Sequence, residues 1–247
     1  SVHQLQYGRI PEWPKGADCK SVASSLRWFE SILSHQKSCI SFLECNFFIF
    51  AVISPEKGGI NMGEILNKAI VYAVKAHNGQ VRKGTQVPYI LHPLEAASIV
   101  GTLTTDEKVI AAAVLHDVVE DTAATTECIQ EAFGERIAAL VAAESENKRE
   151  DLPAGSTWKI RKQETIDHLR DASIEVKMLT LGDKLSNIRS LYRDQLVYGE
   201  RLWQRFNQKD KQEHYWYYKR IAECLTELKN HCAYAEYAGL VEKTFKE

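Results

Sequence analysis

Paired cysteine motifs and a strong excess of charge of either sign are missing from this 247-residue chain. Its six cysteines are scattered and none forms a C-x-x-C pair, so the sequence suggests neither a zinc knuckle nor a disulfide framework. Reduced thiols in a cytoplasm are the simplest interpretation of such cysteines. The formal net charge of −2 lacks the basic field that nucleic-acid binding uses. We therefore expect a cytoplasmic protein without a nucleic-acid partner.

Long hydrophobic runs are also missing. The one stretch that could mimic a membrane segment, residues 39–53, is shorter than the roughly 20 residues that a spanning helix needs. Glu44 and Asn46 interrupt it, and it has neither the position nor the small-residue cleavage pattern of a signal peptide. No lipidation motif occurs in the chain. We therefore expect no membrane partner.

What is present divides the chain into two unlike parts. The composition, 45% hydrophobic and 26% charged, is sufficient for a packed core. Residues 1–61 are irregular, whereas the chain from Met62 onward is dense in Ala, Leu, Ile, Lys and Glu at helical spacing. The turn-like sequence PEKGG at 55–59 separates the two parts. We therefore expect a functional domain at 62–247, preceded by an N-terminal extension at 1–61.

The extension has an unusual sequence. Residues 8–32 resemble the conceptual translation of a transfer-RNA gene, because the codons of Trp28–Ser31 can spell a T-arm consensus and those of Cys19–Ser21 an anticodon loop. We hypothesise that residues 1–61 are translated upstream sequence and not part of the functional domain. The alternative is an N-terminal arm that packs on the domain. The nucleotide sequence before the Met62 codon decides between them, since the hypothesis requires a cloverleaf there.

The second part is predicted to be all-α. Apolar residues three and four positions apart form a single stripe on the first helix, at Ile65, Ala69, Tyr72, Ala73 and Ala76. The pattern predicts further helices over 92–103, 104–121, 125–134, 135–145, 158–172, 174–194, 209–229 and 231–245. No alternating strand pattern of useful length interrupts them. The expected fold is a helical bundle.

The sequence HDVVED at 116–121 carries the most informative chemistry. On a helix, Asp117, Glu120 and Asp121 share one face, with His116 at its edge. Carboxylates so close raise one another's pKa, and a divalent cation removes that conflict. An imidazole with carboxylates suits Mn, Fe, Zn or Mg. A solvated acidic helix end is the alternative, and the apolar residues around the motif disfavour it.

Two other segments can complete such a site. His77 ends the first helix, and His92 follows in the sequence PYILHP. Asp183 lies in the apolar stretch LTLGDKL, with Asn187 one turn further on. A buried aspartate needs a partner. A metal ion, Lys184 or a helix N-terminus could supply it.

Three segments together resemble a known family. AHNGQVRKGTQVPYILHP at 76–93, AVLHDVVEDT at 113–122 and LGDKLSNIR at 181–189 are similar to the metal-dependent HD-superfamily hydrolase domain of RelA/SpoT homologues. The resemblance covers about residues 62–245 and is greatest to the small, single-domain, hydrolase-only members. It implies an all-α HD-domain bundle. It also implies removal of the 3′-pyrophosphate from the alarmones ppGpp and pppGpp with a divalent ion, usually manganese.

The resemblance also assigns roles to residues. The four metal ligands of the family correspond to His77, His116, Asp117 and Asp183. The acidic pair that positions and activates the attacking water corresponds to Glu120 and Asp121, and the asparagine near the nucleotide to Asn187. His92 belongs to the HP signature of the family, and we expect it to cap its helix rather than bind metal.

A substrate with several negative charges needs positive groups at the mouth of the site. We predict this role for a set of six cations together with an aromatic residue one helical turn from the last of them: Arg82, Lys83, Lys159, Arg161, Lys162, Lys211 and Tyr215. Tyr215 would pack on the base or ribose. Taken singly, each is also readily explained as a solvated surface residue.

Two other functions remain open at this level. One is an HD-type phosphohydrolase for another nucleotide, such as NADPH or a nucleoside monophosphate. The other is a non-catalytic module that senses a metal or nucleotide, which the intact set of candidate residues disfavours. In every case we expect a small-molecule nucleotide partner, and a homo-oligomer is compatible with the aromatic-rich C-terminal helices.

Overall fold

The described part of the computed structural model consists of residues 63–146, 149 and 154–246, and it is helical. The predicted extension 1–61 lies outside these residues. One isolated β-bridge, between Val81 and Pro88, is the extended pairing found within the described ranges. The elements are α3 (Glu64–Ala76), α4 (Leu91–Val100), α5 (Glu107–Leu115), α6 (Val118–Asp121), α7 (Thr126–Phe133), α8 (Glu135–Glu144), α9 (Ala154–Arg170), α10 (Ile174–Tyr198), η1 (Gly199–Arg205), α11 (Lys211–Cys224), η2 (Thr226–Leu228) and α12 (Cys232–Lys246). The predicted all-α fold is confirmed.

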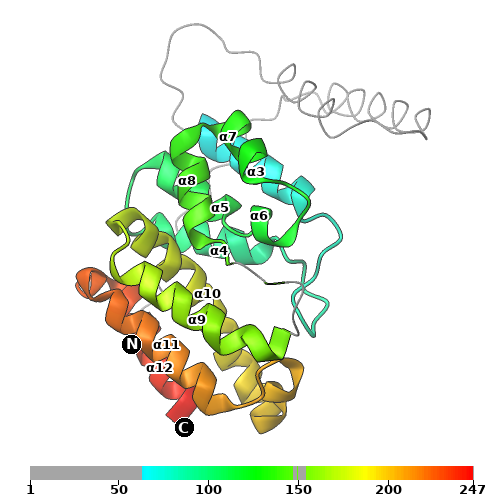
Figure 1. Cartoon of the computed structure of the whole chain (residues 1–247), viewed down its shortest axis with the longest axis vertical. Coiled ribbons are helices and arrows are strands. Elements are labelled where there is room, and N and C mark those ends of the chain that lie inside the picture. Colours follow the sequence, from blue (N-terminus) through cyan, green and yellow to red (C-terminus); the bar gives the residue numbers. More distant parts are fainter. Residues whose placement is uncertain (1–62, 147–148, 150–153, 247) are drawn as a thin grey trace, which may run out of the picture. The chain divides into compact units, whose positions relative to one another are not determined.

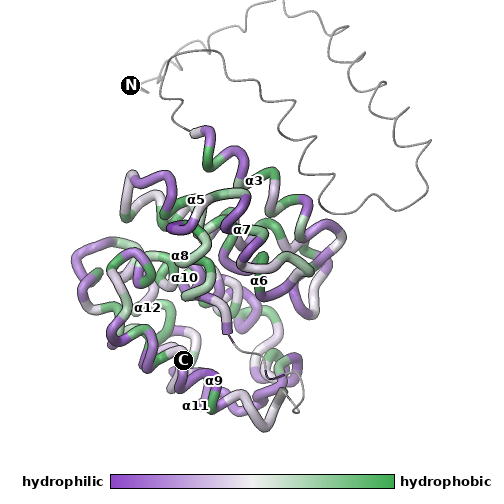
Figure 2. Tube along the Cα trace, turned by 45° about the horizontal axis from the view of Figure 1, so that its top comes forward, coloured by the Kyte–Doolittle hydropathy of each residue, from purple (hydrophilic) through white to green (hydrophobic). Residues whose placement is uncertain are grey.

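Helix α10 runs between two groups of helices (Figure 1). It packs against α4 and α12, and it also contacts α5 and α8. On one side, α5 lies against α3, α4 and α8; on the other, α11 lies against α9 and α12. Helix α5 is buried from Ala111 to Leu115 and is coloured mostly hydrophobic in Figure 2. The buried α5 and α10 therefore provide a rigid scaffold for any polar residue that they carry.

The segment 104–121 differs from the single helix that its pattern predicts. It divides into α5 and the one-turn α6, with His116 and Asp117 at the junction. The ring Nδ1 of His116 donates to the carbonyl oxygen of Ala113 at 2.8 Å, and so competes for an oxygen that a continuing helix would use. Asp117 has φ −90° and ψ −5°, outside ideal helix geometry. The break therefore occurs at the two residues with most of the predicted chemistry.

Gly182 sets how closely α10 and α4 approach. A Cβ atom at this position would lie 2.7 Å from Cγ2 of Val100 and 2.8 Å from the carbonyl oxygen of Ala96. Real Cβ atoms essentially never approach other heavy atoms that closely. The missing side chain therefore allows the backbones of α10 and α4 to pack tightly, just where Asp183 follows in the sequence.

Two sequence-based expectations concern surfaces and thiols. Among the described helices, none is both long and apolar enough to cross a membrane. The three cysteines within the described residues, Cys128, Cys224 and Cys232, are all free thiols.

Candidate active site

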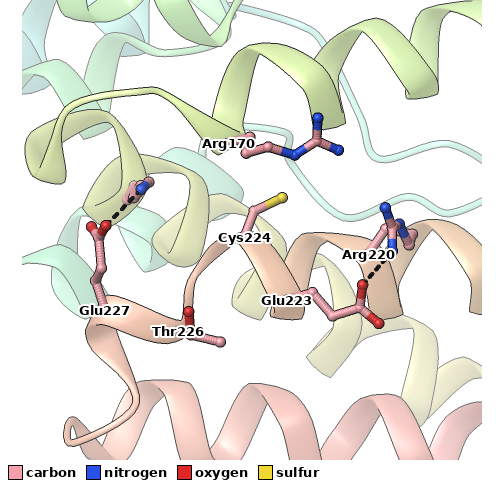
Figure 3. A pocket seen from close by; sticks show the side chains of 7 residues that line it. Arg170, Arg220, Glu223, Cys224, Thr226 and Glu227 are labelled. Carbon is pink, nitrogen blue, oxygen red and sulfur yellow. Dashed lines mark hydrogen bonds and ion pairs between the residues drawn. The ribbon is translucent and has the colours of Figure 1, made fainter.

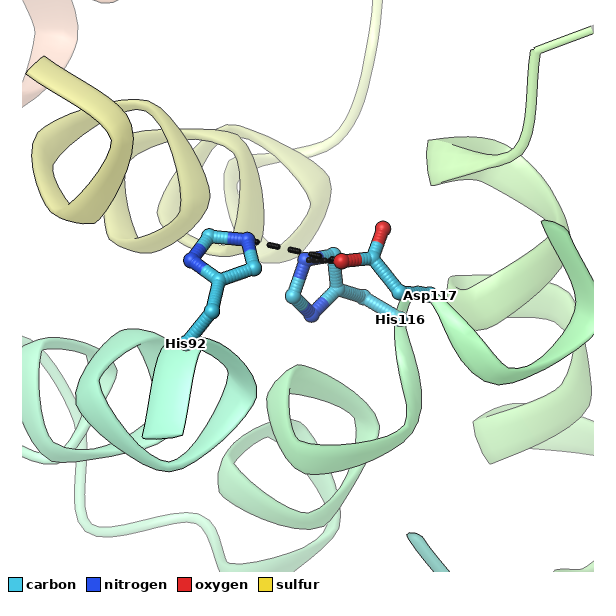
Figure 4. Close-up of side chains that lie close together, drawn as sticks. All are labelled: His92, His116 and Asp117. Atoms are coloured by element: carbon cyan, nitrogen blue, oxygen red, sulfur yellow. Dashed lines mark ion pairs between the residues drawn. The ribbon is translucent and has the colours of Figure 1, made fainter. Parts of the chain in front are cut away.

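Four buried or half-buried side chains from three places in the chain meet in the core. His92 comes from α4, His116 and Asp117 from the α5–α6 junction, and Asp183 from α10. Nε2 of His92 lies 3.4 Å from Oδ2 of Asp117 and 3.1 Å from Oδ1 of Asp183. Nε2 of His116 lies 3.1 Å and 3.7 Å from the same two oxygens. Figure 4 shows both imidazoles directed toward Asp117. We call these four residues the His/Asp cluster.

Charge is balanced within the His/Asp cluster. Burial would lower the pKa of His116, but Asp117 and Asp183 raise it well above its usual value. Burial would likewise raise the pKa of Asp117, but the two histidines hold it well below the usual range. Burial would also raise the pKa of Asp183, but Lys184 and the two histidines hold it well below the usual range. Two ionised carboxylates thus face two imidazoles. Their negative charge is balanced by positive charge placed between the carboxylates and the rings.

The donor set fits a divalent metal ion. Because Nδ1 of His116 donates to a carbonyl oxygen, the neutral ring presents a lone pair on Nε2. This Nε2 is buried and faces Oδ2 of Asp117 at 3.1 Å. Ligand atoms of His92, His116 and Asp117 lie within 4.8 Å of one another. Two imidazole nitrogens with carboxylate oxygens are a common donor set for Mn, Fe or Zn, and a cation can replace the proton that otherwise balances them.

The structure places His77 and His92 differently from the prediction. His92, expected to cap its helix, points into the His/Asp cluster, whereas His77, expected to bind metal, is not among its members. Nδ1 of His77 pairs with Oε1 of Gln80 at 2.9 Å, and its ring packs on Tyr89 with 4.9 Å between centroids. The reason is that α4, not the end of α3, packs against α10. Helical spacing could have indicated that His92 points into the core, because it shares a helix face with the buried Ala96.

Tyr89 is a site residue that the sequence analysis missed. Its hydroxyl lies 2.6 Å from Oδ2 of Asp117 and 2.9 Å from Oδ2 of Asp121. Burial and the two neighbouring acids raise its pKa, so the phenol keeps its proton and donates it to one of them. Gln80 donates to the backbone carbonyl of Asp121 at 2.8 Å. The loop before α4 therefore holds α6 and the HD motif in one arrangement.

The predicted water-activating residues lie beside the His/Asp cluster. Glu120 and Asp121 close α6, one turn after Asp117. Oε2 of Glu120 accepts from the backbone nitrogen of Glu146 at 3.3 Å. Burial, followed by the charges of Asp117, Glu146 and Asp121, raises the pKa of Glu120. The geometry therefore places a partly buried carboxylate next to a candidate metal site, which is where an attacking water would need to be deprotonated.

Some of the predicted cations reach this region. Arg161 and Lys162 both pair with Glu146, at 2.9 Å and 2.5 Å. Burial lowers the pKa of Lys162, although Glu146 opposes that effect. Arg161 and Glu146 line a pocket of about 160 Å³ beside α8 and α9. These two cations are thus linked through Glu146 to the carboxylate of Glu120.

Arg82 and Asn187 are connected to the His/Asp cluster through Asp183. Nη2 of Arg82 donates to Oδ1 of Asn187 at 2.8 Å, and the amide of Asn187 donates to Asp183. Lys184, which the sequence suggested only as a partner for Asp183, pairs with Oδ2 of that residue at 2.5 Å. The structure therefore adds Lys184 to the positive groups near the site.

The remaining predicted substrate contacts face other elements. Lys159 pairs with Glu213 and lies over the Trp216 ring, 3.4 Å from its centroid. Lys211 pairs with Glu200 at 3.1 Å. Tyr215 donates to Glu242 at 3.1 Å and packs on Phe245, so it belongs to the contact between α11 and α12. Lys83 is exposed in the loop before α4. The contacts of these four residues are with elements other than the His/Asp cluster, and their predicted role at the mouth of the site stays a prediction.

A second cavity, of about 260 Å³, lies against α9, α10 and α11 (Figure 3). Four of its charged residues form two ion pairs, Lys177 with Glu227 at 3.0 Å and Arg220 with Glu223 at 2.6 Å. None of the predicted site residues lines it. It is therefore separate from the candidate active site.

Glu144, which the sequence analysis did not single out, is a buried acid behind the site. Its Oε1 lies 2.6 Å from Oγ1 of Thr180, which also lies 3.0 Å from the carbonyl oxygen of Val176. The single hydroxyl proton of Thr180 serves one acceptor, so a protonated Glu144 that donates to Oγ1 satisfies both contacts. Burial raises the pKa of Glu144 to about 7, although Lys184 and Thr180 oppose this shift.

We expect Glu144→Gln to change how stability depends on pH. The native pKa lies above the ordinary value of 4.5, so the wild type loses stability as pH rises from about 4.5 to 7 and keeps that deficit above it. The variant has no such loss, and should gain on the order of 3 kcal/mol over the wild type at pH 8 relative to pH 5. Urea unfolding with a metal chelator present measures this, with the exposed Glu131→Gln as control. Equal pH slopes for wild type and Glu144→Gln would contradict it.

Comparison with known proteins agrees with this geometry. The family model of the HD domain matches residues 69–205, which include the whole His/Asp cluster, so the chain belongs to the HD domain family. Among curated relatives, it is 35% identical over 133 residues to guanosine-3′,5′-bis(diphosphate) 3′-pyrophosphohydrolase MESH1 of Danio rerio, which covers 52% of this chain and 70% of that protein.

Longer relatives also match about half of the chain. Identity to the GTP pyrophosphokinase of Myxococcus xanthus is 37% over 131 residues, which is 52% of this chain but 17% of that enzyme. Identity to the guanosine-3′,5′-bis(diphosphate) 3′-pyrophosphohydrolase of Aquifex aeolicus is 39% over 132 residues, 52% of this chain and 18% of that enzyme. The chain thus matches less than a fifth of these enzymes.

Two solved structures are similar to the fold. One is described as a metazoan ortholog of SpoT that hydrolyzes ppGpp and plays a role in starvation responses; it matches with a TM-score of 0.57 and 26% identity, over 78% of this chain and 97% of that one. The other, lmo0812 from Listeria monocytogenes EGD-e, has a TM-score of 0.55 and 33% identity, over 65% and 97%.

Proposed function

We propose that this protein is a metal-dependent hydrolase that removes the 3′-pyrophosphate from guanosine alarmones, giving GDP or GTP and pyrophosphate. The observation that carries the proposal is the buried His/Asp cluster with Glu120 and Asp121 beside it. The matches to MESH1 and to the SpoT ortholog support alarmones as the substrate class. The functional domain is proposed to be 62–247, and the free cysteines support a place in the cytoplasm.

In this proposal the ligands are His92, His116, Asp117 and Asp183, and the metal is manganese, which suits mixed nitrogen and oxygen donors. A bound divalent ion would lower the pKa of a water and neutralise phosphate oxygens. Side chains of the protein position and deprotonate the water. Glu120 and Asp121 orient the attacking water and accept its proton.

Cations next to the site would bind the pyrophosphate. Arg161, Lys162 and Lys184 are partly or fully withdrawn from water, which strengthens their attraction for phosphate oxygens. Arg161 and Lys162 now bind the carboxylate of Glu146, which presents them with oxygens much as a phosphate would. Arg82 and Asn187 are placed to contact the nucleoside.

Product analysis with purified protein tests the function. We expect ppGpp with Mn²⁺ to give GDP and pyrophosphate in equal amounts, and a chelator to stop the reaction. The same assay with NADPH and nucleoside monophosphates tests the other nucleotides. A folded protein that binds Mn²⁺ and leaves ppGpp intact would exclude the proposal and favour a sensing module. A chain that starts at Met62 should be as active as the full chain.

Separate alanine substitutions of His92 and His77 test the proposed ligand set directly. His92→Ala removes a proposed ligand, so its Mn²⁺ affinity should fall by more than the roughly 10–100-fold that loss of a partner around a metal ligand costs. His77→Ala removes only the contacts to Gln80 and Tyr89, so we expect Mn²⁺ to bind nearly as before. Titration of free Mn²⁺ by electron paramagnetic resonance measures both. The opposite order would restore His77 as the ligand.

A further inference from the structure

The ring nitrogen of His92 that faces away from the His/Asp cluster, Nδ1, takes part in a series of hydrogen bonds that the proposed reaction does not use. Nδ1 of His92 lies 2.8 Å from the hydroxyl oxygen of Ser186 on α10. That hydroxyl lies 2.8 Å from Oε2 of Glu95, one turn after His92 on α4. Ser186 is buried, so water does not replace these partners. The chain therefore connects a buried imidazole to a carboxylate at the surface.

The single proton on the Ser186 hydroxyl gives this chain a direction. The carboxylate of Glu95 only accepts when it is ionised, so Ser186 donates to it. The hydroxyl then has lone pairs left for His92, and Nδ1 must carry the proton that is shared between them. If Nδ1 were the bare nitrogen, two acceptors would compete for one hydroxyl proton, and a buried polar contact would be lost.

Fixing the proton on Nδ1 determines what the other ring nitrogen can do. In the neutral ring, Nε2 holds the lone pair, and it faces Asp117 and Asp183 at 3.4 Å and 3.1 Å. In the charged ring, Nε2 carries a second proton for those carboxylates while Nδ1 stays protonated. A metal ion can replace the Nε2 proton in the same orientation, without any rotation of the ring.

Glu95 is itself held by the C-terminal helix. Nη1 of Arg189 donates to Oε1 of Glu95 at 3.0 Å. The same guanidinium donates through Nε and Nη2 to both oxygens of Glu236 on α12, each at 2.7 Å. A guanidinium paired in this way fixes the position of the Glu95 carboxylate. The chain of contacts thus runs from the His/Asp cluster through α4 and α10 to α12.

We propose that Ser186 and Glu95 are positioning residues for His92: they hold its proton on Nδ1, so that Nε2 always presents its lone pair to the metal. This inference rests on the proposed metal site. It adds that the affinity of the site is set partly by residues outside the ligand set, and that α12 contributes through Arg189.

Nitrogen-15 NMR of the histidine rings tests the proton directly in the metal-free full-length protein. Long-range couplings distinguish the two neutral forms, and His92→Asn identifies the signals of His92. At a pH where the ring is neutral, we expect the wild type to show His92 protonated on Nδ1. In Ser186→Ala this preference should disappear, since the hydroxyl acceptor is gone. A wild-type ring protonated on Nε2 would overturn the inference, whether or not ppGpp is hydrolysed.

Metal affinity provides the second readout. We expect Ser186→Ala and Glu95→Gln to weaken Mn²⁺ binding by about 10-fold or more, as is usual for partners around a metal ligand. Glu95→Gln acts at a half-exposed position, so it tests the idea even if the buried Ser186→Ala fails to fold. Free Mn²⁺ is again measured by electron paramagnetic resonance.

Arg136 offers a matched control for Arg189. It is also half-exposed and also joins carboxylates of different segments, Asp106 and Glu175, but it lies away from the His/Asp cluster. Arg189→Ala should weaken Mn²⁺ binding several-fold, whereas Arg136→Ala should leave it unchanged. Equal affinities for the wild type, Ser186→Ala and Glu95→Gln would show that these residues serve packing only. Failure of ppGpp hydrolysis with these metal results intact would leave the positioning role in place and remove only the proposed substrate.

Discussion

Asp117→Asn is expected to lower kcat/KM for ppGpp by about 10³-fold or more, since a metal-centred stabilisation of several kcal/mol is lost with its proposed ligand. The substitution keeps the size of the side chain and removes its charge. In the structure, Oδ2 of Asp117 contacts His92, His116 and Tyr89 together, so it is the atom that most of the site shares. Steady-state release of pyrophosphate at several Mn²⁺ concentrations measures the loss.

Metal binding should fall with activity in this variant. We expect the Mn²⁺ dissociation constant to rise strongly, and high Mn²⁺ to restore little of the rate. The exposed Asp167→Asn, on α9, is the control and should behave as wild type. Activity that survives in Asp117→Asn, with its circular dichroism unchanged, would mean that the His/Asp cluster is structural and the chemistry occurs elsewhere.

Glu120→Gln is expected to separate chemistry from metal binding. Loss of a general base typically costs 10²–10⁴-fold, so we expect kcat to fall by about that factor. The Mn²⁺ affinity should change little, because Glu120 lies beside the His/Asp cluster and bonds to the backbone of Glu146. Single-turnover rates with ppGpp and Mn²⁺ titration of the same sample give the two numbers.

The exposed Glu127→Gln on α7 is the control for this second substitution. A parallel loss of Mn²⁺ affinity in Glu120→Gln would make Glu120 a ligand. An unchanged kcat would indicate that Asp121 activates the water instead. Asp121 shares the Tyr89 hydroxyl with Asp117. Asp121→Asn, assayed alongside, distinguishes these outcomes.

The fold could be predicted well because it follows local rules. Helical spacing of apolar residues specifies both the helices and their buried faces, and the Gly and Pro positions mark many of their ends. The break at His116 and Asp117 could not be predicted in this way. It depends on a side chain that bonds to the backbone of Ala113, and the apolar period continues through it.

The structure groups the predicted site residues only in part, and the differences in their positions share a cause. His77 and His92 are both buried, so neither burial nor residue type distinguishes them; only the packing of α4 on α10 does. The positions of the cations could not be predicted for a related reason. A lysine such as Lys159 is attracted to the nearest carboxylate or aromatic ring, and which one that is depends on how distant helices pack.

The absent side chain of Gly182 has a consequence for the order in which the molecule assembles. His92 and Ser186 are 94 positions apart and meet only where the backbones of α4 and α10 come together. Closing so long a segment carries an entropic cost in an unfolded chain. A cation with ligands on both helices therefore binds only chains in which that docking is complete, and adds its binding energy to the native state alone. By this linkage, the metal would stabilise the correctly docked native state as well as take part in the reaction.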